Sequence, residues 1–203
     1  MKKIFFSVII VIVFNGCTSH NTSTSSAAST DSAAITEIKK DSFFPVTSFI
    51  KGQMILLDSL PVTPLHIITI DHKTDSIWLK KAQLPTLLAD FLSPEIKETN
   101  LTNFFNETSF NDQTLNAITM TYSPITVLPD SISLRHWDIY INPETGNITK
   151  VYLVKQLKNK DGITTQQLTW TTNKWAMITT LLNKPDDSTK ILKEEKIIWN
   201  FTE

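Results

Sequence analysis

The chain has 203 residues, with 19 Lys and Arg against 20 Asp and Glu, and a formal net charge of −1. It has one arginine, Arg135, so the basic stripe of a nucleic-acid-binding protein is missing and we expect no nucleic-acid partner. Its one cysteine, Cys17, excludes an intrachain disulfide, and the stability of the fold must therefore come from its core.

The N-terminus has the pattern of a secretory signal. Lys2 and Lys3 precede an apolar run over residues 4–14 that only Ser7 interrupts. This run is too short to cross a bilayer, which takes about 20 residues, but it has the length of a signal-peptide apolar region. A small residue, Gly16, then stands directly before Cys17.

The stretch FNGC at 14–17 resembles the lipobox of bacterial lipoproteins, although Phe14 and Asn15 stand where Leu and a small residue are usual. Looser lipoboxes of this kind occur in Bacteroidetes-type bacteria. The resemblance implies a signal peptide over residues 1–16, cleavage between Gly16 and Cys17, and a diacylglyceryl group on Cys17. Two acyl chains give stable membrane anchoring where one gives only marginal binding. The alternatives are an unmodified buried cysteine and a short uncleaved anchor.

Residues 17–40 then form a Ser/Thr-rich tether in this interpretation, because they cannot bury enough apolar area to offset the entropy of ordering. A flexible chain of this length spans roughly 25 Å. No acidic residue follows Cys17 before Asp31. The lipoprotein resemblance then implies the periplasmic side of the outer membrane, because an adjacent retention Asp and an acidic export run are both missing.

The tether also contains a candidate modification site. Residues 31–33, DSA, resemble the D-[ST]-aliphatic O-glycosylation sequon of Bacteroidetes-type exported proteins, which makes Ser32 a candidate glycosylation site. Ordinary turn and cap chemistry is the alternative explanation for an Asp-Ser pair.

Residues 41–112 are predicted to form an α/β subdomain with the element order α-β-β-α. Apolar residues at helical spacing predict a helix over 46–58. Two β-rich runs around a polar turn predict a hairpin over 65–81. A second helical pattern begins at Leu84, and Pro94 marks its end.

Residues 113–203 are predicted to form an antiparallel β-meander, so the fold class is α+β, as one domain or two small subdomains sharing an interface. The six β-rich stretches are LNAITMTYS, SLRHWDIYIN, NITKVYLVKQL, GITTQQLTWTT, KWAMITTLL and KILKEEKIIWNF. Gly146 and Asn173 occupy turn positions that favour a left-handed backbone. Side-chain alternation places Trp137 on the opposite face from His136 and Asp138.

Motifs for chemistry are missing from the sequence. It has no G-x-S-x-G, H-E-x-x-H, phosphate loop or dinucleotide fingerprint, so we expect a protein that is not an enzyme and uses no cofactor. A metal site from His66, Asp71 and His72 is conceivable, but the six-residue spacing of the histidines favours turn chemistry, and we expect no metal. His136 and Asp138 share a strand face and have the geometry of an acid/base pair or of a surface ion pair.

Tryptophans are the remaining candidates for ligand contact. Trp137, Trp170 and Trp175 fall in the predicted meander, where aromatic rings on a concave sheet line a ligand pocket in some proteins. The alternative is that they form the core of a domain without disulfides.

These observations predict a lipid-anchored, non-enzymatic binding or assembly accessory module of the cell envelope. Its partners would be the membrane, through the N-terminal lipid, and another envelope protein. A carrier that holds a lipid, glycan or peptide on a curved sheet is the alternative, and an envelope hydrolase is a third class that the missing motifs disfavour.

Overall fold

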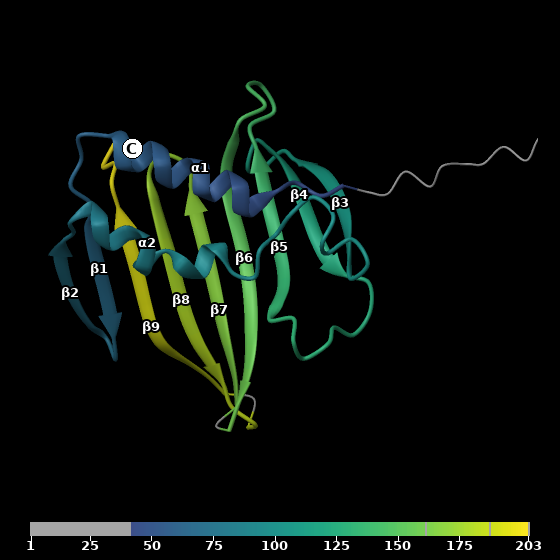
Figure 1. Cartoon of the computed structure of the whole chain (residues 1–203). Coiled ribbons are helices and arrows are strands. Elements are labelled where there is room, and N and C mark those ends of the chain that lie inside the picture. The colour runs from purple at the N-terminus through teal and green to yellow at the C-terminus, as the bar shows by residue number, and fades with distance from the viewer. Residues whose placement is uncertain (1–41, 161, 187, 203) are drawn as a thin grey trace, which may run out of the picture. The chain divides into compact units, whose positions relative to one another are not determined.

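The computed structural model describes residues 42–160, 162–186 and 188–202. Over this part of the chain, nine antiparallel strands form one sheet, and helical segments lie across one of its faces (Figure 1). The helical segments are α1 (Val46–Ser59), the 3-10 turn η1 (Lys81–Gln83), α2 (Leu84–Leu87) and the 3-10 turn η2 (Ala89–Leu92). The strands are β1 (Leu65–Ile70), β2 (Lys73–Trp78), β3 (Phe105–Asp112), β4 (Ala117–Pro124), β5 (Leu134–Ile141), β6 (Ile148–Asn159), β7 (Gly162–Thr171), β8 (Trp175–Asn183) and β9 (Thr189–Ile198).

The strand order is β2-β1-β9-β8-β7-β6-β5-β4-β3. Strands β3 to β9 follow one another as a meander, and the N-terminal hairpin extends the sheet by pairing β1 with β9. The predicted α+β character and the α-β-β-α order of the first part are present, but the sheet dominates. The expected subdomain boundary at 112/113 falls between β3 and β4, which pair along their full length.

Helix α1 closely matches the predicted helix over 46–58. Its buried residues Val46, Ile50 and Leu57 recur at helical spacing and face the sheet. Thr47 fixes the start of the helix, because its hydroxyl accepts a hydrogen bond of 2.7 Å from the backbone N–H of Ile96. At the other end, the Lys81 ammonium donates to the backbone carbonyl oxygens of Asp58 and Leu60, where the helix dipole favours a cation.

The hairpin prediction is also correct, with a tighter turn than expected. Asp71 and His72 form the turn with positive φ angles of 46° and 63°. The later turns follow the sequence prediction as well, since Gly146 and Asn173 have φ angles of 69° and 59°. At Gly162, an added Cβ would lie 2.3 Å from the carbonyl oxygen of Asn183, so only glycine fits at this turn.

Two elements differ from the sequence prediction. The helix expected from Leu84 is a single α-turn between η1 and η2. Strand β3 was not predicted, because only Phe105 at its start is buried and the following residues show no apolar alternation. This strand forms the sheet edge through backbone pairing with β4.

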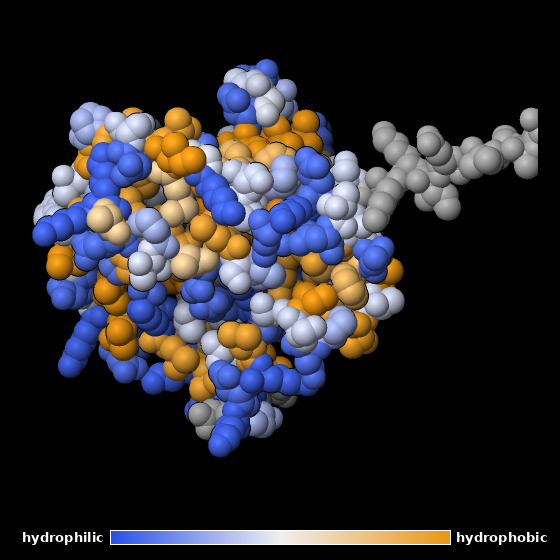
Figure 2. Space-filling view, in the orientation of Figure 1, coloured by the Kyte–Doolittle hydropathy of each residue, from blue (hydrophilic) through white to orange (hydrophobic). Residues whose placement is uncertain are grey.

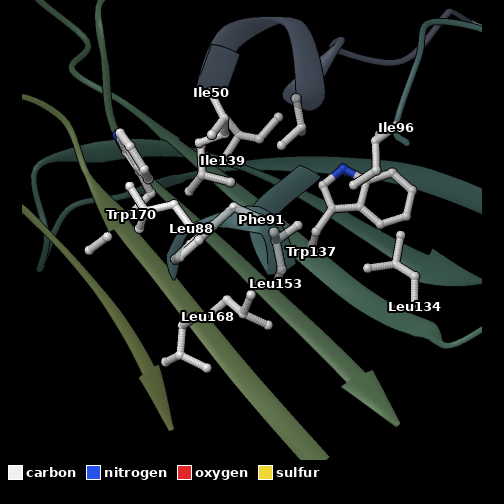
Figure 3. Packing of buried hydrophobic residues seen from close by; sticks show 14 of the residues in the cluster. Ile50, Leu88, Phe91, Ile96, Leu134, Trp137, Ile139, Leu153, Leu168 and Trp170 are labelled. Carbon is white, nitrogen blue, oxygen red and sulfur yellow. The ribbon is translucent and has the colours of Figure 1, made fainter. Parts of the chain in front are cut away.

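The core lies between the sheet and the helical segments (Figure 3). Trp137, Trp170, Ile139 and Ile50 are fully buried. One charged side chain enters this layer: the Lys155 ammonium donates to the backbone carbonyl of Asp90 and so pins η2 to strand β6. Burial lowers the pKa of Lys155, and the nearby Asp90 carboxylate partly offsets that effect.

Candidate functional site

Two of the three candidate tryptophans belong to the core. Trp137 stacks on Tyr122, with ring centroids 4.5 Å apart and planes 7° apart, and it also contacts Phe105. Trp170 packs edge-on against Phe91 of η2, at 5.5 Å between ring centroids. Both indoles are fully buried: Trp170 packs against the helical layer, and Trp137 packs against side chains of the neighbouring strands.

Trp175 lies on the opposite face of the sheet. It pairs with Thr171 across the β7–β8 turn, while its neighbour Ala176 pairs with the buried Trp170. The Lys196 ammonium sits over the Trp175 ring, 4.6 Å from its centroid. The three tryptophans therefore do not line one common pocket.

A groove does exist, and it lies between α1 and the η1–α2–η2 segment. Its volume is about 410 Å³, within the range of small-molecule sites. Figure 2 shows apolar side chains gathered on this helical face of the molecule. The groove is lined by Lys51, Met54, Ile55, Leu57, Asp58, Lys81, Leu84, Pro85 and Leu92.

Apolar side chains form most of the groove surface, and some are well exposed. Among the lining residues, Pro85 is exposed and Ile55 is 72% exposed. Leu57 and Leu84 close the floor, where both are buried. Isolated exposed apolar residues are ordinary on protein surfaces, but a contiguous set around a groove indicates a binding site.

The charges at the groove differ between its two ends. Lys51 lies 3.9 Å from the carboxylate of Glu95, which also accepts a shorter contact of 2.9 Å from Lys97. These lysines lower the pKa of Glu95, mainly through the hydrogen bond from Lys97. At the other end, the groove is lined by Asp58 and Lys81, one charge of each sign.

Sequence reasoning missed this groove, although a signal was present. Residues 54–57 read MILL, four consecutive apolar residues in a helix. Because a helix turns 100° per residue, such a run cannot all face one core, and at least one side chain must face outward. The second wall comes from a segment almost 30 residues further on, and no local pattern shows that the two meet.

His136 and Asp138 are brought together on the open face, as the alternation predicted. The His136 Nε2 lies 2.9 Å from Asp138 Oδ2, and Thr121 donates to Asp138 Oδ1 at 2.7 Å. Asp138 is 8% exposed. The pKa values of the flanking Tyr140 and Tyr152 hydroxyls are raised mainly by the burial of these tyrosines, and further by the negative charge of Asp138. Each carboxylate oxygen has a partner within the chain, so this cluster is a satisfied hydrogen-bond network of the sheet.

His66 lies apart from the turn residues with which a metal site was considered. It is at the start of β1, whereas Asp71 and His72 follow the end of that strand. His66 is 4% exposed, and its Nε2 is 3.5 Å from the Glu195 carboxylate on β9. Across the described ranges, no three His, Cys, Asp or Glu side chains are grouped so as to hold a metal ion.

Gly16, Cys17 and Ser32 lie outside the described residues, so cleavage, lipid attachment and glycosylation stay predictions. Within the described part, no helix is both long and apolar enough to span a bilayer. Comparisons of the chain with protein-family models, curated proteins and solved structures gave no match.

Proposed function

We propose that this protein is a lipid-anchored, non-enzymatic binding module of the bacterial cell envelope. In this proposal the signal peptide is removed after Gly16, and Cys17 carries the diacylglyceryl group. The tether holds the folded part at the periplasmic side of the outer membrane. The lipobox-like residues support the anchor, and the apolar groove between α1 and α2 is the observation that carries the binding role.

The groove supports binding of a hydrophobic group better than it supports catalysis. Its lining is mostly apolar, Lys51 is paired with Glu95, and Lys81 donates to backbone carbonyls. A general acid or base must reach the reacting atoms, and the His136–Asp138 pair lies on the other face of the sheet. Desolvation of the ligand would supply the binding energy, at roughly 25 cal/mol per Å² of apolar area.

A photoreactive neutral alcohol tests the binding role directly. The lipidated full chain is placed in phosphatidylcholine vesicles with a diazirine-bearing dodecanol, irradiated and digested. We expect adducts on the peptides of α1 and α2, and about tenfold fewer in Ile55→Asp, because an alkyl chain in the groove would remove water from the new carboxylate. Val127→Asp is the matched control, since Val127 is 97% exposed in a distant loop. Labelling that avoids both groove walls would overturn the binding role.

A labelling experiment tests the anchor. Cells expressing the full chain are grown with an alkyne fatty acid, and the protein is purified under denaturing conditions. We expect label on the wild type and none on Cys17→Ala, which should accumulate as an uncleaved precursor. Persistent label on the variant would refute lipid attachment at Cys17.

The carrier function is the second candidate, and the volume of the groove favours it. About 410 Å³ suits one small ligand, and the exposed Ile55 at the groove leaves a route for exchange. A carrier should pass the alkyl probe from donor to acceptor vesicles faster than spontaneous transfer, whereas a static binding module should retain it. The groove, and not a set of tryptophans on the sheet, would hold the cargo.

A further inference from the structure

The shape of the groove restricts its occupant. Lys51, Ile55 and Asp58 are spaced four and three residues apart along α1, so they form one stripe on the helix. At 1.5 Å rise per residue, this stripe is about 10 Å long. Leu84 and Pro85 face it from α2, and Leu92 of η2 also lines the groove. The site is thus a short, mainly apolar trough with a volume of about 410 Å³.

The chemistry of the lining favours an alkyl chain over an extended peptide. A peptide brings a backbone N–H and C=O at every residue, and each needs a partner when it loses water. The backbone of α1 is bonded within its own helix, and the side chains between the two ends of the trough, Met54, Ile55, Leu57, Leu84 and Leu92, are apolar. An alkyl chain has no polar group to satisfy, so the same lining suits it completely.

The charges orient such a chain. Beside Lys51, two ammonium groups, those of Lys51 and Lys97, surround the single carboxylate of Glu95. Asp58 and Lys81 at the opposite end balance each other, and the Lys81 ammonium is held by the carbonyl oxygens of Asp58 and Leu60.

We infer that the groove between α1 and α2 binds a free fatty acid, with its alkyl chain in the trough and its carboxylate at Lys51. A carboxylate fits because two ammonium groups there face the single carboxylate of Glu95, and a single alkyl chain fits because the groove volume is about 410 Å³. The inference rests on the proposed function, of which it names the ligand class.

A paired-probe experiment separates the two claims. The lipidated full chain in phosphatidylcholine vesicles is labelled with diazirine-bearing dodecanoate or dodecanol at pH 8, and adducts on the groove peptides are quantified. We expect the dodecanoate-to-dodecanol ratio to fall about threefold in Lys51→Gln, as for the loss of one partly exposed ion pair, and to be retained in Lys51→Arg. Lys73→Gln, on exposed strand β2, is the control and should leave the ratio unchanged.

Each other outcome has a definite meaning. If both probes label the groove and Lys51→Gln leaves their ratio unchanged, the fatty-acid inference is wrong while the binding role stands. The same experiment can be repeated with a diazirine-bearing dodecyl phosphate. If its labelling falls more in Lys51→Gln than that of dodecanoate, the ligand carries a phosphate head group and the inference is again overturned. If neither probe labels α1 or α2, the proposed function itself fails. If dodecanol labels the groove, dodecanoate does not, and an amphipathic helical peptide displaces the dodecanol, a protein partner overturns the fatty-acid inference.

Discussion

The two faces of the sheet use the same residue types for different purposes. Trp170 and Trp175 are five positions apart across the β7–β8 turn, yet the first is fully buried under η2 and the second lies on the face that no described helix covers. The covered face excludes water with aromatic and aliphatic side chains. The open face satisfies its polar groups laterally, as Thr121 and His136 do for Asp138. Register, and not residue type, decides which role an aromatic side chain takes.

The largest expected effect tests this contrast with tryptophan. Trp137→Ala should destabilise the fold by about 3–5 kcal/mol, because it removes a fully buried indole and leaves a cavity against Tyr122 and Phe105. Trp175→Ala, which loses a partly exposed ring on the open face, should cost less, about 1–2 kcal/mol. Urea unfolding monitored by circular dichroism measures both. Equal losses would mean that the two faces contribute alike.

An intermediate effect is expected at the buried carboxylate of the open face. Asp138→Ala should cost about 1–2 kcal/mol, because Thr121 and His136 lose their shared acceptor in a site that is 8% exposed. Asp130→Ala is the control, since the Asp130 side chain is 87% exposed and pairs with the exposed Lys158. If the two variants unfold at the same urea concentration, the network does not stabilise the open face.

The pH dependence of stability provides a smaller test at the margin of the covered face. Burial lowers the pKa of His66 below its ordinary value, Glu195 raises it and Lys193 lowers it further. As the pH falls below about 6.5, the unfolded chain takes up this proton before the folded chain does. The contribution of neutral His66 is therefore complete above that pH and is lost as the pH falls toward the folded-state pKa.

Urea midpoints between pH 7.5 and 5.5 measure this linkage. The wild type should lose stability over that range more steeply than His66→Gln, which cannot take up the proton. His72→Asn, in the exposed turn with positive φ, should retain the wild-type slope. A steeper slope in His66→Gln would reverse the sign and refute the assignment.

The smallest effect is expected in the groove. Ile55→Asp should change the free energy of unfolding by less than about 0.5 kcal/mol, because Ile55 is 72% exposed. Together with the loss of probe labelling, a near-zero effect would separate binding from folding. A loss as large as that of Trp137→Ala would instead make Ile55 a core residue and remove the groove as a site.

Local patterns predicted much of the fold. Helix α1, the hairpin and six strands of the meander follow from spacing, and the alternation at Trp137 and Asp138 is confirmed. Strand β3 could not be predicted from the sequence, because an edge strand forms through backbone pairing and needs no apolar alternation. Helix α2 is shorter than its spacing indicated, since its leucines pack on the sheet through 3-10 turns on both sides.

The candidate site was far less predictable than the fold. Its two walls, α1 and α2, are brought together only by packing on the sheet, so no sequence window contains both. The tryptophans were candidates because of their residue type, but Trp137 and Trp170 are fully buried in the core. The lipobox resemblance was readable because it is a linear motif, and its test does not depend on the fold.

Native mass spectrometry of the protein gently extracted from its own membranes tests the central claim most directly. The account predicts a chain that begins at Cys17 and carries diacylglyceryl, together with an additional noncovalent mass of one fatty acid that disappears in Ile55→Asp and remains in Val127→Asp. A mass equal to the unmodified chain, with no bound species, would contradict both the anchor and the binding role.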